Sequence, residues 1–130
     1  MGVRKLQEVR AVKYMFLLNR TTDGLPEPGT AEFDRTMQAY GAALEALGKA
    51  GVLIDCAPLA ARSSATTVRV RDGETILVDG PSAEIKEQLG GYAIVECADL
   101  DEALKWAAIM PAARDASVEV RPIVAVQAPV

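Results

Sequence analysis

Asp79 is the carboxylate in this chain whose setting could support chemistry. It ends the segment TTVRVRDGETILVDG, in which Asp72-Gly73 predicts a two-residue turn because both residues tolerate positive φ. The resulting hairpin pairs Arg71 with Glu74, and alternation places four side chains on one face: Val68, Val70, Leu77 and Asp79. If that face is buried, Asp79 points inward and could act as a general base or anchor a ligand. The alternative is an ordinary Asp-Gly-Pro turn, in which the carboxylate caps backbone N–H groups.

Other side chains could join Asp79 in a binding site. The turn after Asp79 should bring the next few residues near it, and Lys86 among them could supply a cation to an acidic ligand. Tyr14 and Tyr92, on apolar strands, could donate hydroxyl groups. The alternatives are a solvated lysine and two core tyrosines. The candidate catalytic residue is therefore Asp79, and the candidate ligand-binding residues are Tyr14, Asp79, Gly80, Pro81, Ser82, Lys86 and Tyr92.

The chain contains no histidine, and this excludes Ser-His-Asp and Cys-His catalysis. The two cysteines, Cys56 and Cys97, lie in or next to apolar strands, where we expect small buried hydrophobic residues rather than a disulfide. Without histidine these cysteines cannot make an ordinary zinc site, and no EF-hand spacing is present. We therefore expect no metal and no cofactor.

Charge and hydropathy narrow the class of partner. A net charge of −4 argues against nucleic acid, which would require a clustered basic face. The longest apolar run, YMFLL, is far shorter than the roughly 20 residues needed to span a bilayer, and no signal-peptide cleavage site follows it. We therefore expect a cytoplasmic protein that binds neither nucleic acid nor membrane.

The elements that position these residues follow a recognisable order. They are a strand over 11–18, a helix from the cap Thr30 to about Gly51, a strand over 52–59, the hairpin, a turn or short helix over 81–89, a strand over 91–97, a helix begun by the capping box Asp99–Glu102 and stopped by Pro111, and a strand over 117–124. Without the hairpin this is the βαββαβ pattern of an α+β, ferredoxin-like fold, with the first and third framework strands central. Residues 1–11 form an expected N-terminal extension, 12–124 the domain and 125–130 a tail.

Several segments carry a family resemblance: KYMFLL, AYGAALEALGKAGVL, ATTVRVRDGETILVDGP, the segment DGPSAEIKEQLGGYAIVE, DLDEALKWAAIMPAA and VEVRPI. Over about residues 12–124 the chain resembles the DGPF-motif group of the YCII-related family. The resemblance implies a ferredoxin-like domain that dimerises through its sheets as a dimeric α+β barrel, with a cleft near the DGP turn. Ser82 stands where the family typically has Phe, so an aromatic wall of that cleft is missing. Some relatives carry a His-Asp pair, of which this chain could supply only the aspartate.

Two classes of function follow. The first is a small-molecule-binding or regulatory homodimer, since the chain offers no histidine and no metal site. The family resemblance also implies a link to extracytoplasmic-function sigma factors, because many relatives are encoded beside them. The second is a cofactor-free isomerase or lyase with Asp79 as general base, which requires that its carboxyl be desolvated and its pKa raised. The sheet itself predicts the homodimer, because helices cover one face of a ferredoxin-like sheet and the apolar side chains of the other need cover.

Overall fold

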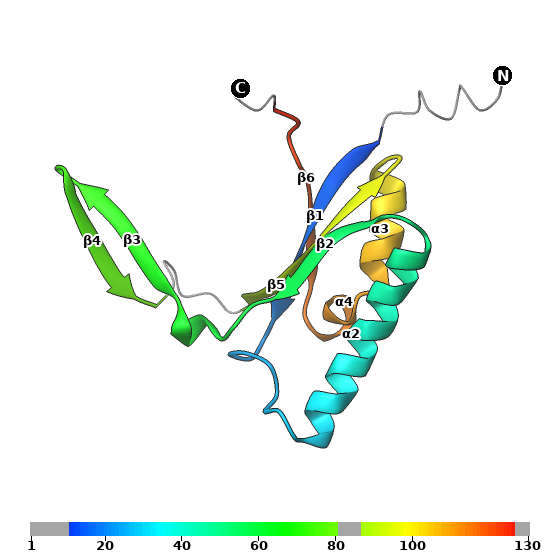
Figure 1. Cartoon of the computed structure of the whole chain (residues 1–130), viewed down its shortest axis with the longest axis horizontal. Coiled ribbons are helices and arrows are strands. Elements are labelled where there is room, and N and C mark those ends of the chain that lie inside the picture. Colours follow the sequence, from blue (N-terminus) through cyan, green and yellow to red (C-terminus); the bar gives the residue numbers. More distant parts are fainter. Residues whose placement is uncertain (1–10, 81–86, 127–130) are drawn as a thin grey trace.

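A four-stranded antiparallel sheet forms the framework of the molecule (Figure 1). The computed structural model describes residues 11–80 and 87–126. The strand order is β2 (Leu53–Pro58), β5 (Gln88–Cys97), β1 (Val12–Arg20) and β6 (Val118–Pro122). β1 and β5 are therefore central, as the apolar character of their segments predicts. The predicted ferredoxin-like order is confirmed, although β5 begins at Gln88 rather than Gly91 and residues 81–86 lie outside the description.

Three helices lie on one side of this sheet (Figure 1): α2 (Ala31–Lys49), α3 (Leu100–Ala108) and α4 (Pro111–Asp115). The Thr30 hydroxyl caps α2 by accepting a 3.1 Å bond from the Phe33 N–H. The predicted capping box starts α3: Asp99 accepts from the Glu102 N–H at 2.9 Å, and the Glu102 carboxylate accepts from the Ala98 N–H at 2.8 Å. Pro111 follows the end of α3 as predicted, but it also begins the short additional helix α4, because proline suits the first helical position.

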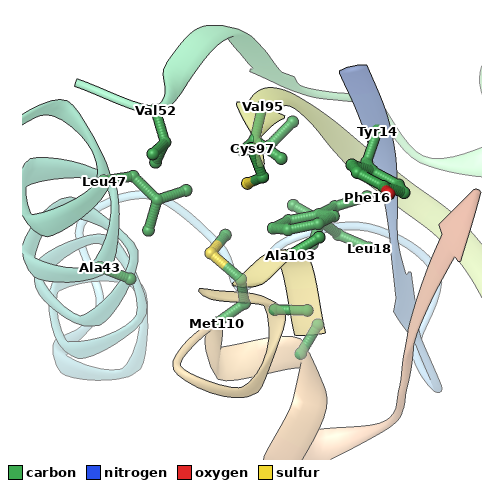
Figure 2. Packing of buried hydrophobic residues seen from close by; sticks show 13 residues of the cluster. Tyr14, Phe16, Leu18, Ala43, Leu47, Val52, Val95, Cys97, Ala103 and Met110 are labelled. Carbon is green, nitrogen blue, oxygen red and sulfur yellow. The ribbon is translucent and has the colours of Figure 1, made fainter. Parts of the chain in front are cut away.

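The hydrophobic core lies between these helices and the sheet. Three alternate residues of β1 are buried in it, Tyr14, Phe16 and Leu18, and Phe16 has no exposed surface. Figure 2 shows side chains from α2, the central strands and the α3–α4 junction meeting in one cluster, with Leu47 and Met110 among them. The first strand is a nearly continuous apolar run without alternation, a pattern that predicts cover on both of its faces. Instead, Met15 and Leu17 alternate with the core residues and are only half-buried.

The predicted hairpin forms a separate two-stranded sheet of β3 (Thr66–Arg71) and β4 (Glu74–Asp79), which projects away from the main sheet (Figure 1). Its register agrees with the prediction, since Arg71 pairs with Glu74. Asp72 and Gly73 have φ values of 52° and 79°, as a tight hairpin turn requires. The predicted buried face is absent from the single chain, because the apolar residues of the hairpin are exposed: Val68, Val70, Ile76, Leu77 and Val78.

Candidate functional site

The described residues that the sequence singles out do not gather in one place. Tyr14 is buried in the core, on the helix-covered face of β1. Tyr92 lies on the opposite face of the sheet, since it alternates with the buried Ala93 along β5. Asp79 and Gly80 stand at the end of the separate hairpin. The remaining three predicted residues, Pro81, Ser82 and Lys86, lie outside the part of the chain that the structure describes.

Asp79 is an exposed residue at the base of the hairpin. The expectation of an inward-facing carboxylate is therefore not met within one chain. Two hydrogen bonds hold this end of the hairpin: the Gly80 N–H donates to the Ala65 carbonyl oxygen at 2.6 Å, and the Thr67 hydroxyl donates to the Gly80 carbonyl oxygen at 2.7 Å. Gly80 has a φ of 101°, a backbone conformation that favours glycine. The Asp-Gly pair thus acts as a structural turn in the single chain.

A largely apolar cavity of about 240 Å³ lies beside α2, at the end of the sheet where β1 finishes. Met37 and Leu44 line it from α2, Leu18 from β1 and Pro58 from β2, while Tyr92 contributes from β5. Concave and mostly apolar sites with a few polar groups are typical of small-molecule binding. Two residues supply polar groups of this kind, Arg20 at the end of β1 and Tyr40 on α2.

Arg20 is a half-buried cation in this cavity wall. Its guanidinium lies over Gly90, and a Cβ on Gly90 would stand only 2.7 Å from the Arg20 Cζ. The side chain forms no ion pair or hydrogen bond with any residue in the described ranges 11–80 and 87–126. Burial lowers the pKa of the Arg20 guanidinium, and the nearby phenol of Tyr40 partly offsets that effect. Arg20 is therefore a partly desolvated positive charge without an anionic partner among these residues.

Tyr40 lies on α2 and packs against the core, but only part of its side chain is buried. Burial raises the pKa of the Tyr40 phenol, while the Arg20 charge acts in the opposite direction and Asp115 adds to the rise. The hydroxyl therefore stays protonated at neutral pH and can donate a hydrogen bond. Arg20 and Tyr40 are close enough for each to influence the ionisation of the other.

A second, more polar cavity of about 330 Å³ shares Arg20, Leu25 and Tyr40 with the first. Glu32 and Thr36 of α2 line it, together with Asp115 at the end of α4 and the loop that follows β1. The two cavities thus meet at the Arg20–Tyr40 pair. One side of the pair is apolar and the other carries acidic groups.

A chain of hydrogen bonds fixes the end of β1 that carries Arg20. The Asn19 amide donates to the Ser117 hydroxyl at 3.1 Å, and the Ser117 hydroxyl in turn donates to a carboxylate oxygen of Glu87. The Asn19 backbone N–H also donates to the Ser117 carbonyl oxygen at 3.1 Å. These bonds tie β1 to the start of β6 and to the residue before β5, so the backbone beneath Arg20 is held from both sides.

The Tyr92 side chain makes a polar contact with β2 on the open face of the sheet. Its hydroxyl donates to Asp55 Oδ2 at 3.2 Å, while Asp55 Oδ1 accepts from the Cys56 N–H at 2.9 Å. The Asp55 carboxylate raises the pKa of the Tyr92 phenol, first through its charge and then through this hydrogen bond. Tyr92 is the predicted ligand-binding residue that lines the cavity, and its hydroxyl is already engaged.

Sequence reasoning missed Arg20 and Tyr40. Arg20 falls in the polar segment after the first predicted strand. Tyr40 recurs with Met37 and Leu44 at helical spacing, which predicts a buried stripe. The Gly90-Gly91 pair was a usable signal, because two adjacent glycines in a central strand leave room for another group to approach the backbone. That room is taken by Arg20 on one side and by β2 on the other.

Within the described ranges, no group of three or more His, Cys, Asp and Glu residues is arranged to hold a metal ion. None of the helices in those ranges has the length and apolar character needed to cross a membrane. Cys56 and Cys97 are both free thiols, and Cys97 is buried.

The antiparallel sheet order β2-β5-β1-β6, with helices on one side, defines a ferredoxin-like α+β protein. The model of the YCII-related domain matches residues 12–127, and the chain belongs to that family. The chain is also similar to an uncharacterised protein of Rhizobium meliloti strain 1021, with 43% identity over 94 residues. That match covers 71% of this chain and 76% of the relative.

Proposed function

We propose that this protein is a homodimer that binds a small molecule in the apolar cavity beside α2. The observation that carries this proposal is a mostly apolar hollow whose wall contains Arg20, a half-buried cation with no anionic partner in the described ranges. A buried charge is costly unless it is paired, so a site that leaves Arg20 unpaired favours a ligand that completes it. The cytoplasmic location expected from the sequence and the regulatory role implied by the family resemblance belong to the same proposal.

The dimer is supported by the face of the sheet that the helices leave open. Cross-strand partners place Met15 opposite Ile94 and Leu17 opposite Tyr92, so four half-buried side chains form a contiguous patch at its centre. Helices α2, α3 and α4 all lie on the other side (Figure 1). A patch of this kind on the two central strands favours a second layer of protein.

Charged residues surround this patch in both signs. Lys13 lies opposite Glu96 on the neighbouring strand. On β6, Arg121 Nε lies 3.9 Å from Glu119 Oε2, and both residues are exposed. A two-fold interface requires a surface that is complementary to itself, and a patch edged by both signs meets that requirement.

A cavity-filling substitution tests the binding proposal. Gly41 lines the cavity from α2, and a Cβ there has no neighbour within 4 Å, so Gly41→Leu should fill the hollow. We expect this variant to lose binding of small apolar compounds in a ligand-detected NMR screen. Gly48→Leu is the matched control, since Gly48 has the same open surroundings on the same helix but does not line the cavity. Equal binding by both variants and the native protein would contradict the proposed site.

The dimer is tested by light scattering on Leu17→Lys, which places a charge at the centre of the open face. We expect the native protein to have the mass of two chains and this variant to have the mass of one. Leu100→Lys is the control, because Leu100 is exposed on α3, on the helix side. A native protein that is monomeric at micromolar concentration would refute this part of the proposal.

A further inference from the structure

Arg20 is the one positively charged residue among the described residues that line the two cavities. It stands at their junction, with the apolar cavity on one side and the polar cavity on the other. Its guanidinium presents a planar fork of N–H donors that matches a carboxylate. We propose that the ligand is an apolar monocarboxylic acid whose carboxylate pairs with Arg20. This inference deepens the binding function proposed above and rests on it.

The acidic residues of the polar cavity restrict the ligand to a single negative charge. Glu32 and Asp115 line that cavity with Arg20, so two negative charges oppose one positive charge. A second anionic group on the ligand would approach these carboxylates and be repelled, since like charges in a partly desolvated site are costly. The same reasoning excludes phosphorylated ligands, which carry more than one charge at neutral pH.

The apolar cavity limits the size and chemical character of the rest of the ligand. Leu18, Met37 and Leu44 provide aliphatic walls, and Pro58 adds a further apolar surface. The volume of about 240 Å³ lies below the range of about 300–1,000 Å³ that is usual for drug-sized ligands. The ligand body is therefore a single ring or a short alkyl chain.

Tyr40 supplies the second polar group at the junction. Its hydroxyl remains protonated at neutral pH and can donate to a carboxylate oxygen that Arg20 leaves free. Two donors of different kinds fix the orientation of a carboxylate better than one. Their combined preference is for an acceptor with two oxygen atoms.

The experiment compares three compounds that share one ring. Phenylacetate, its neutral amide phenylacetamide and the dicarboxylate phenylmalonate are titrated against the native protein, and binding is followed by NMR. We expect saturable binding of phenylacetate. Phenylacetamide should bind at least about tenfold more weakly because it lacks the charge that strengthens the hydrogen bond to Arg20. Phenylmalonate should also bind at least about tenfold more weakly because Glu32 and Asp115 repel its second carboxylate. The carboxylate assignment is overturned by equal affinities for phenylacetate and phenylacetamide, or by no phenylacetate binding at millimolar concentration.

Substitution of Arg20 tests whether the carboxylate of the ligand binds to this residue. Arg20→Met keeps an unbranched apolar stem and removes the charge, and it should weaken phenylacetate binding about tenfold or more. Arg35→Met is the matched control, because Arg35 is exposed on α2, lines neither cavity and should leave the affinity unchanged. Equal affinity in Arg20→Met and the native protein would overturn the assignment.

The two proposals fail in different ways. If neutral compounds bind the native protein but not Gly41→Leu, the small-molecule site is supported and only the proposed carboxylate ligand is refuted. If the native protein binds none of the three probes and no compound in the broader screen, both proposals are refuted.

Discussion

The guanidinium of Arg20 lies against the backbone of Gly90, with its Cζ and Nε each 2.7 Å from the position that a Gly90 Cβ would take. The next glycine meets a different neighbour. A Cβ on Gly91 would stand 2.9 Å from the carbonyl oxygen of Ala57, which belongs to the backbone of β2. Two adjacent glycines therefore make room for two different things, a flexible cation and a paired strand.

Gly90→Ala should alter the binding site and spare the fold. The added methyl group displaces the end of a flexible side chain, so Arg20 keeps its charge but loses its position over the strand. We expect phenylacetate affinity to fall several-fold, while the free energy of unfolding changes by less than about 1 kcal/mol. NMR titration and urea denaturation measure the two effects. Unchanged affinity would show that the position of the guanidinium over Gly90 does not matter for binding.

Gly91→Ala should destabilise the fold. Its methyl group meets a backbone carbonyl that cannot move without disturbing the pairing of β2 with β5. Overpacking of this kind costs about 1–3 kcal/mol, and we expect a loss of that size in the free energy of unfolding, measured by urea denaturation. The neighbouring Gly90→Ala variant is the natural control. A stability equal to that of the control would mean that β2 shifts away at little cost.

Much of the fold could be predicted because local signals agreed with one another. The cap Thr30, the box from Asp99 to Glu102 and the Asp72-Gly73 turn each act through neighbours in sequence, and all three form as predicted. The cover expected on both faces of β1 does not depend on local signals alone. A continuous apolar strand favours a second layer on its other face, but the described residues of one chain supply no such layer, and Met15 remains half-buried.

The candidate site was less accessible to sequence reasoning because it depends on contacts between distant segments. Arg20 meets Gly90 across the β1–β5 pairing, and it meets Tyr40 across the space between β1 and α2. No local motif marks either contact. The hairpin register was predicted correctly, and it places Asp79 on the same face as Leu77. Register alone does not determine whether another layer packs against that face.

Thr30→Ala tests the start of α2, the helix that carries Tyr40. The Thr30 side chain satisfies the Phe33 N–H, so its removal leaves that donor to water. We expect a loss of about 1 kcal/mol in the free energy of unfolding, by urea denaturation. Thr30→Ser is the control, since serine caps as well as threonine and should keep the stability. If Thr30→Ala were as stable as Thr30→Ser, the cap would contribute nothing.

Stability should fall at alkaline pH because of Cys97. Burial raises the pKa of the Cys97 thiol from 9.0 to about 11, and the charges of Glu102 and Asp99 add to the rise. The unfolded chain therefore loses this proton at lower pH than the folded chain does. The resulting contribution is fully present below pH 9 and is lost as the pH rises to about 11.

The measurement is urea denaturation across that pH interval, for the native protein and for Cys97→Ala. Tyr40, whose pKa is also raised, contributes in the same direction in both proteins. The part of the decline that disappears in Cys97→Ala is then due to the thiol. Parallel declines in the two proteins would show that Cys97 ionises equally in the folded and unfolded states.

The last prediction concerns Asp79 and separates the binding protein from the isomerase or lyase alternative. Asp79 is exposed on the hairpin in one chain, and a general base needs a desolvated position. We expect Asp79→Asn, which keeps the shape and removes the charge, to bind phenylacetate as the native protein does. If Asp79→Asn instead lowers the affinity about tenfold or more in the dimer, but not when Leu17→Lys separates the chains, Asp79 belongs to a site shared between two chains. A turnover that falls about 10²-fold in Asp79→Asn while binding persists would establish the enzyme.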